Sequence, residues 1–197
     1  MRKIQLVLVA LIVLILSAFK ADHVITIYMI GDSTMSNKPL EGNNQERGWG
    51  HVLGSFFTED VRVENHAMNG RSSKSFIDEG RWETVVNKIR PGDYVFIQFG
   101  HNDEKPQPER HTDPGTTFDE NLRKFVRETR AKGGIPVLFN SIVRRNFGVN
   151  PDAVAADDIR PEKDEAVVEG DTLIDTHGKY LESPRNVAKE MDVCFID

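Results

Sequence analysis

The sequence lacks the features that mark several common classes of protein. It contains one cysteine among 197 residues, so no disulfide can form within the chain. That residue, Cys194, stands between apolar neighbours and is expected to be a buried thiol. The histidines and acidic residues show none of the spacings typical of a metal site, so we expect neither a metal nor another cofactor.

Positively charged residues are fewer than negatively charged ones. The chain has 25 lysine and arginine residues against 31 aspartate and glutamate residues, which gives a formal net charge of −6. Proteins that bind nucleic acids or anionic membranes do so through clustered cations. The charge balance therefore argues against both of these partners.

No run of apolar residues approaches the roughly 20 that cross a bilayer as a helix. The apolar stretch Leu6–Leu16 follows the basic start Met1-Arg2-Lys3 and precedes small residues, which is the pattern of a secretory signal peptide. We therefore predict a signal peptide at 1–21 and one secreted or periplasmic domain at 22–197. An uncleaved N-terminal anchor is the alternative, since no Ala-x-Ala cleavage site is present. The sequence does not indicate an oligomeric state.

Short runs of β-branched and aromatic residues alternate with segments of helical periodicity. The runs are bounded by Gly, Pro or Asp, as buried parallel strands are, and they cover 24–30, 61–66, 94–99 and 135–141. Helices are predicted at 48–57, 77–89, 117–132 and 179–191. This alternation predicts an α/β fold: a three-layer α/β/α sandwich with a mainly parallel, flavodoxin-like central sheet.

Two segments near the end of the chain depart from this alternation. Residues 146–175 contain two prolines and many acids with little periodicity, so they are predicted to form a long surface loop beside the strand ends. Residues 193–197 have the character of the start of one more strand. We therefore expect the last strand and the C-terminal part of the fold to be missing from this chain.

Three of the predicted strands run into polar turns that carry chemistry. The first leads into Gly31-Asp32-Ser33, the second into Asn69-Gly70, and the third into Gly100-His101-Asn102-Asp103. The carboxyl ends of parallel strands lie side by side, and ligands bind in the crevice where the strand order reverses. A serine hydroxyl, a glycine amide and an asparagine amide meeting there would suit acyl transfer, with Ser33 also opening the next helix.

These motifs carry a resemblance to a known family. The chain resembles the SGNH (GDSL-type) hydrolase superfamily and, within it, the rhamnogalacturonan acetylesterase family. The segments that match are Gly31–Met35, Asn65–Phe76, Gly100–Asp103, Glu79–Trp82 and Val143–Phe147. The resemblance implies that Ser33 is the nucleophile and that Gly70 and Asn102 donate to the oxyanion. It further implies a secreted serine esterase that removes O-acetyl groups from plant cell-wall polysaccharide, foremost pectic rhamnogalacturonan.

The family's final block, an Asp and a His that are separated by two residues and supply the general base, has no counterpart in this sequence. We therefore expect the chain to be truncated before that block and inactive by itself. Asp175-Thr176-His177 is an alternative acid and base pair, although its spacing is one residue too short. The remaining histidines, at 23, 51, 66, 101 and 111, are interpreted as surface or supporting residues.

Arginines and a tryptophan in the matching segments suggest how a pectic substrate would bind. A planar guanidinium fits a galacturonate carboxylate, so Arg71 and Arg81 are predicted to bind substrate, with Arg144 and Arg145 as further candidates. Trp82 is predicted to stack on a sugar ring. The alternatives are that the arginines pair with acids to hold loops and that an amphipathic helix buries Trp82.

Two other functions stay open at this point. One is an esterase for lipid, aryl, thioester or acetylxylan substrates, which an apolar pocket would favour. The other is a carbohydrate-binding protein that keeps the pocket and lacks the base. The arginine-rich motifs favour the polysaccharide esterase over the first alternative.

Overall fold

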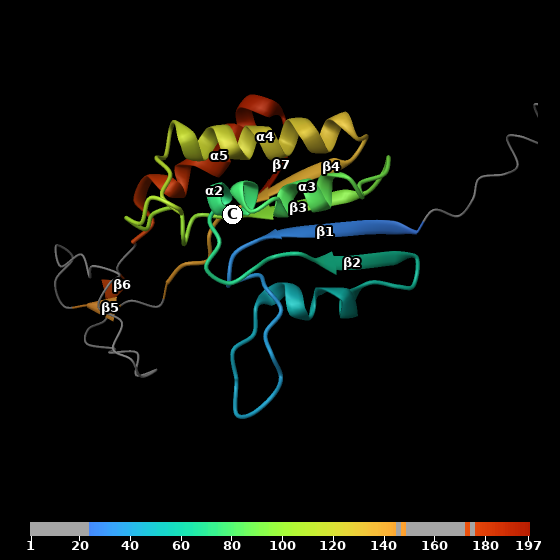
Figure 1. The fold of residues 1–197 in the computed structure, drawn as a ribbon, viewed down its shortest axis with the longest axis horizontal. Helices are drawn as coiled ribbons and strands as arrows, with labels where there is room; N and C mark the ends of the chain where they lie inside the picture. The colour runs from blue at the N-terminus through green and yellow to red at the C-terminus, as the bar shows by residue number, and fades with distance from the viewer. Residues whose placement is uncertain (1–23, 145–146, 149–171, 174–175) are drawn as a thin grey trace, which may run out of the picture.

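The computed structural model describes residues 24–144, 147–148, 172–173 and 176–197 (Figure 1). The predicted signal peptide and nearly all of the predicted 146–175 loop lie outside these residues. Five parallel strands form the central sheet: β1 (Ile25–Gly31), β2 (Val61–Asn65), β3 (Tyr94–Gln98), β4 (Ile135–Phe139) and β7 (Cys194–Ile196). The last of these confirms the additional strand predicted near the end of the chain.

The order of strands in the sheet is β2-β1-β3-β4-β7. Counted along the chain this is 2-1-3-4-5, the doubly wound order of the predicted flavodoxin-like sheet. Strand β1 is buried from Thr26 to its end because it has a neighbour on each side and is covered on both faces. The order reverses between β1 and β3, so a ligand crevice is expected at the carboxyl ends of these two strands.

All four α-helices in the described part of the chain cover one face of the sheet: α2 (Ser73–Asp78), α3 (Arg81–Val86), α4 (Thr117–Ala131) and α5 (Glu182–Met191) (Figure 1). Helix α4 buries Phe118, Leu122 and Phe125 at helical spacing, as its periodicity predicted. These side chains pack on Ile97 and Leu138 of the sheet. The main hydrophobic core therefore lies between this face and the helices.

The opposite face has a thinner cover than the predicted helix 48–57 would give. That segment forms two short 3₁₀ helices, η1 (Trp49–His51) and η2 (Leu53–Phe56), which pack on a small apolar cluster that includes Ile27 and Met29. Glycines at 48, 50 and 54 weaken an α-helix there. Within the described residues, the second helical layer therefore consists of these two short segments.

The expectation that Cys194 is buried was wrong: its side chain is exposed. Cys194 lies on β7, which is an edge strand of the sheet. Its neighbours Val193 and Phe195 pack against the main core, so the alternation of side chains along the strand turns Cys194 to the opposite face. An edge position on the thinly covered face explains the exposure.

The helix predicted at 77–89 is two shorter helices. Gly80 takes a left-handed conformation with φ of 69°, which separates α2 from α3. Helix α2 begins earlier than predicted because Ser72 and Ser75 form a reciprocal capping box at its start.

Two smaller elements complete the described chain. The 3₁₀ helix η3 (Gly178–Tyr180) precedes α5, and β5 (Phe147–Gly148) pairs antiparallel with β6 (Thr172–Leu173). The β5–β6 pair lies within the segment predicted to be a loop. None of the described helices has the length and apolar character that a membrane crossing needs.

Candidate active site

Ser33 lies in a tight turn directly after β1. Asp32 holds this turn, because its backbone carbonyl accepts from the amides of Met35 and Ser36 and its Oδ1 accepts from the amide and hydroxyl of Thr34. Ser33 is partly exposed, and neither its amide nor its hydroxyl is hydrogen-bonded to a residue that the structure describes. The hydroxyl is therefore accessible at the carboxyl edge of the sheet.

The prediction that Ser33 opens a helix was wrong. The backbone makes a single turn over residues 32–36 and then continues as an irregular loop to η1. Pro39 and Gly42 follow soon after the turn, and both residue types disfavour a continuing helix. Any stabilisation of negative charge near Ser33 must therefore come from individual N–H groups and not from a helix dipole.

Gly70 lies in the loop after β2 with φ of +73°, a conformation that residues with a Cβ rarely adopt. A Cβ added there would have no protein atom within 4 Å, so this side of the residue faces open space. No described residue accepts a hydrogen bond from its amide. Gly70 thus offers a free N–H at the same edge of the sheet as Ser33.

Asn102 follows β3 and is 6% exposed. Its side-chain amide donates to the carbonyl of Arg71 at 3.2 Å, which joins the loop after β3 to the loop that holds Gly70. An amide has two N–H donors, and no described residue takes the second. Asn102 is therefore held in place while one donor stays available.

Further contacts hold the three loops together at the point where the strand order reverses. The Ser36 hydroxyl donates to Asn69 Oδ1 at 2.5 Å, which ties the Ser33 turn to the Gly70 loop. On the other side, Gln98 Oε1 accepts from Thr34 Oγ1 at 3.2 Å and from Trp49 Nε1 at 2.8 Å. These contacts join the loops that carry Ser33, Gly70 and Asn102, while the roles of the three residues stay predictions.

A serine hydroxyl beside free amide donors can support acyl transfer. The serine would attack a carbonyl carbon, and the donors would stabilise the negative charge that develops on the carbonyl oxygen. This chemistry needs the donors to be fixed before the reaction begins. The hydrogen bonds of Asn102 and of the Ser33 turn supply that rigidity.

A buried carboxylate beneath the site was not predicted. Asp103 is fully buried and accepts from the amide and hydroxyl of Ser73, the amide of Gly100 and the hydroxyl of Thr112. Burial raises its pKa to about 6, against the opposing effect of these hydrogen bonds. Because Asp103 adjoins Asn102, this network fixes the backbone that positions the Asn102 amide. In the sequence, Asp103 was marked only as the last residue of Gly100–Asp103, one of the segments that resemble SGNH hydrolases.

Lys38 is a second unpredicted component. It is 8% exposed, and its ammonium donates to Asn69 Oδ1 at 2.7 Å, the same oxygen that accepts from Ser36. Its second contact is a 3.6 Å ion pair with Glu46. The burial of Lys38 could not be predicted from the sequence without knowing that Asn69 accepts from its ammonium group. Together, Ser36, Lys38 and Asn69 lock the Gly70 loop against the Ser33 turn.

The structure does not favour His177 as the base. Its side chain is 1% exposed, its Nδ1 lies 2.9 Å from Glu104 Oε2, and its Nε2 lies 3.2 Å from the Ile142 carbonyl. Arg144 is bonded to the other oxygen of Glu104. With both ring nitrogens engaged, His177 fits a role in joining the segment before α5 to the loops after β3 and β4.

His101 stacks edge-on against His177 with ring centroids 4.5 Å apart. Its Nε2 lies 2.8 Å from the Ile142 carbonyl. Burial, together with the charges of His177 and Arg144, lowers the pKa of His101, although nearby Asp32 and the Ile142 carbonyl oppose this. These contacts match the interpretation of His101 as a supporting residue, and the lowered pKa favours its neutral form.

The other described histidines contact neighbouring side chains or backbone atoms outside the three loops of the site or at their edges. His66 is within 3.3 Å of Glu64, and burial lowers its pKa. His51 and His111 contact the backbone of Lys38 and Lys105. No group of three or more potential metal ligands is found among the described residues.

The predicted substrate-binding residues do not all lie where that role requires. Trp82 is 2% exposed, its ring meets Phe125 edge-on at 5.0 Å, and its Nε1 donates to Glu128. Stacking on a sugar is therefore excluded for Trp82 in this structure, and burial by an amphipathic helix is what occurs. The reason is that Trp82 lies on the core side of α3.

Arg71 and Arg81 share one acid. The Arg71 Nε lies 3.1 Å from both oxygens of Glu79, and Arg81 Nε lies 2.5 Å from Glu79 Oε2. Arg71 also donates to the carbonyl of Asn69. These contacts match the alternative in which the arginines hold loops, so a substrate role for either arginine stays a prediction. Arg144 is paired with Glu104, and Arg145 lies outside the described residues.

Gly50 should be irreplaceable for the packing of the Ser33 turn. A Cβ at this position would lie 2.6 Å from the Met35 carbonyl oxygen and 2.6 Å from Asn65 Nδ2. We expect Gly50→Ala to lower the free energy of unfolding by about 1–3 kcal/mol through overpacking, as measured by urea denaturation.

Gly54→Ala is the matched control, because its Cβ would come no nearer than 3.8 Å to Val63. Equal stabilities of the two variants would contradict the close approach at Gly50.

Comparisons with known proteins identify the family of the chain. The model of the GDSL-like lipase/acylhydrolase family matches residues 29–197. The chain is 38% identical over 173 residues to the rhamnogalacturonan acetylesterase RhgT of Bacillus subtilis, covering 88% of this chain and 64% of that protein. It is 40% identical over 128 residues to the probable rhamnogalacturonan acetylesterase YesY of the same organism, covering 64% of this chain and 57% of that protein. The chain thus spans less than two thirds of either relative.

Solved structures show the same fold. The crystal structure of YxiM from Bacillus subtilis aligns with a TM-score of 0.65 at 26% identity, covering 88% of this chain and 43% of that one. The psychrotrophic esterase EstA from Pseudoalteromonas aligns with a TM-score of 0.56 at 17% identity, covering 86% of this chain and 75% of that one. The resemblance to SGNH hydrolases is therefore confirmed, and the chain belongs to the GDSL-like lipase/acylhydrolase family.

Proposed function

We propose that this chain carries the nucleophile and the oxyanion donors of a secreted esterase that removes O-acetyl groups from polysaccharide. The observation that carries the proposal is the arrangement of Ser33, Gly70 and Asn102 on three joined loops at the switch point of the sheet. The serine hydroxyl, the glycine amide and one amide N–H of the asparagine are all without partners among the described residues. Such an arrangement is what an acyl-transfer site requires before substrate binds.

In the proposed reaction, Ser33 Oγ attacks the acetyl carbonyl and forms a tetrahedral intermediate. The Gly70 amide and the Asn102 side chain donate to its oxyanion, with the Ser33 amide as a third donor. The bond between the acetyl carbon and the sugar oxygen then breaks, and the sugar oxygen takes the proton that the base removed from Ser33. Water, activated by the same base, hydrolyses the acetyl-serine to acetate and free Ser33. A general base must accept the Ser33 proton in the first step.

An Asp and His block following residue 197 is the proposed source of that base, on the family resemblance. The histidines of the described chain serve less well. His177 is buried with both nitrogens engaged, and His66 lies against Glu64. Ser33 is partly exposed, so a base from a later segment could approach its hydroxyl.

The substrate class is proposed from the relatives and from local charge. Two relatives with 38–40% identity are named as rhamnogalacturonan acetylesterases, one of them as probable. Five of the seven residues that line the cleft beside Gly70 are charged, which supports a substrate with polar or charged groups over a lipid. An acetylated pectic polysaccharide of the plant cell wall satisfies both observations.

Asn102→Ala tests the proposed oxyanion role. In a protein that carries this chain and the Asp/His block, we expect kcat on acetylated pectin to fall about 100- to 1,000-fold, as is typical for loss of one oxyanion donor. KM should change little, because the amide acts on charge that develops only in the transition state. The measurement is the steady-state rate of acetate release.

Asn87→Ala is the matched control, because Asn87 is exposed at the end of α3. Asn102→Asp keeps the shape of the side chain and removes the donor, so it should lose kcat to a similar degree. Full activity of Asn102→Asp would contradict a donor role. Thermal melts of each variant would show whether a loss reflects unfolding instead.

A further inference from the structure

A cleft of about 390 Å³ opens beside Gly70, within the range of about 300–1,000 Å³ typical of small-molecule sites. Its walls come from the Gly70–Arg71 loop, the end of α2 and the loop after β3. The lining residues are Gly70, Arg71, Ser75, Asp78, Glu79, Glu109 and Arg110. Because Gly70 belongs both to this cleft and to the proposed oxyanion site, a ligand in the cleft would lie next to the reacting ester.

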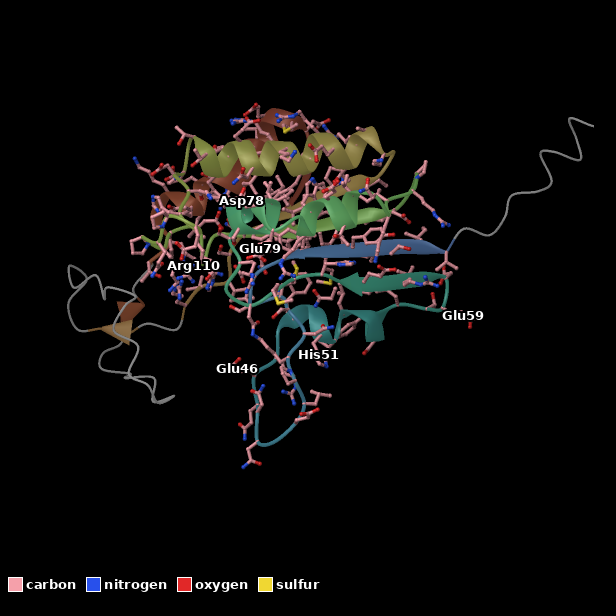
Figure 2. All side chains as sticks on the ribbon, in the orientation of Figure 1. Glu46, His51, Glu59, Asp78, Glu79 and Arg110 are labelled. Atoms are coloured by element: carbon pink, nitrogen blue, oxygen red, sulfur yellow. The ribbon has the colours of Figure 1, made fainter. Side chains whose placement is uncertain are left out.

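Most charges around the cleft are already paired. Asp78 accepts from Lys74 at 2.6 Å, and Glu79 accepts from Arg71 and Arg81. These pairs leave the guanidinium of Arg110, which is half-buried and makes no ion pair or hydrogen bond with any described residue. Figure 2 shows Arg110 and Glu79 on the side of the molecule where the strands end. A half-buried guanidinium without a protein partner is available to pair with an anionic group of a ligand.

The backbone holds Arg110 in a defined position. The amides of Arg110 and His111 donate to the Gln107 carbonyl at 2.9 Å, which forms a turn. Two residues later, Thr112 is bonded to buried Asp103 through its amide and its hydroxyl. The Tyr180 hydroxyl also bonds the Thr112 carbonyl. The Arg110 loop is therefore anchored to the residue that adjoins Asn102.

We propose that Arg110 is a specificity-determining residue that binds a carboxylate of an acidic sugar adjacent to the acetylated residue of the substrate. A guanidinium pairs with a carboxylate through two parallel hydrogen bonds, which fixes the orientation of the sugar. Glu109, exposed at the rim, can accept from sugar hydroxyls. Arg71 lines the same cleft, but its guanidinium already contacts Glu79 and the Asn69 carbonyl. The inference rests on the proposed function for the class of ligand.

Equilibrium binding separates this inference from the catalytic one, because it needs no turnover. The probes are an acetylated rhamnogalacturonan oligosaccharide and its carboxyl-reduced form, titrated into the 197-residue chain by calorimetry. We expect Arg110→Gln to weaken binding of the acidic oligosaccharide at least about tenfold and to leave binding of the reduced form unchanged. Arg62→Gln is the matched control, since it removes one positive charge from an exposed residue of β2.

Equal losses for both oligosaccharides, no loss for either, or no binding of the acidic form by the unaltered chain would overturn the proposal. A loss shared by Arg62→Gln would assign the effect to overall charge and would overturn it as well. The esterase proposal is tested by a separate experiment. If it is wrong, a serine-directed phosphonate will not label Ser33 in the protein extended through the Asp/His block. Discrimination by Arg110 combined with such a failure would leave an acidic-sugar site on a protein that is not an esterase.

Discussion

Ser33→Ala is expected to abolish acetate release and labelling by a serine-directed phosphonate in a protein that carries this chain and the predicted Asp/His block. The loss should approach the roughly million-fold effect of removing the nucleophile from a comparable hydrolase, because no other group can form the acyl intermediate. Thermal stability should change little, since the hydroxyl makes no hydrogen bond with the described residues. Labelling is measured by mass spectrometry of the modified peptide.

Ser55→Ala provides the control for that experiment. Ser55 is an exposed serine of η2 and lies outside the three loops of the site. Its variant should keep full activity and full labelling. Retention of the phosphonate on a serine other than Ser33 in Ser33→Ala would contradict the assignment.

The second large effect concerns the 197-residue chain itself. We expect its activity on p-nitrophenyl acetate to be at least about a thousandfold below that of the protein extended through the Asp/His block. The members of a catalytic triad act as a unit, and removal of one leaves only the residual catalysis of the oxyanion donors. The comparison is made from kcat/KM at matched concentrations of folded protein.

Near-normal turnover by the 197-residue chain would contradict this expectation and would return attention to His177. In that case His177→Gln should remove the activity. The structure disfavours this outcome, because the His177 ring is 1% exposed and lies between Glu104 and the Ile142 carbonyl. For His177 to act as the base, its Nε2 would have to leave the Ile142 carbonyl.

The strands and the order of elements were predictable from the sequence. Each strand of the central sheet lies within one or two residues of its predicted bounds, because β-branched runs between Gly, Pro and Asp leave little choice of conformation. Helix α4 was predictable for a similar reason, since its apolar residues recur at helical spacing.

Predictions failed where a glycine or a capping residue outweighed periodicity. Gly80 divides the helix predicted at 77–89, and the Ser72–Ser75 capping box begins α2 early. The segment predicted as an α-helix forms short 3₁₀ helices, because Gly48 and Gly50 disfavour an α-helix. Both glycines pack closely against the backbone of the Ser33 turn. The prediction that Cys194 is buried was wrong because the sequence does not reveal which strand lies at an edge of the sheet.

The sequence by itself determined which loops meet, because three polar motifs follow three strands and parallel strands end at one edge of the sheet. It could not determine how the side chains in those loops are partnered. The sequence pointed to Arg71 as an anion ligand and gave no signal for Arg110. In the structure, however, Glu79 at the end of α2 pairs with Arg71, while the guanidinium of Arg110 has no partner among the described residues. Trp82 is likewise buried by Phe125, a residue of a different helix. Only the tertiary structure decides such matters, because the energy of a charged or aromatic side chain depends on partners that distant parts of the chain bring to it.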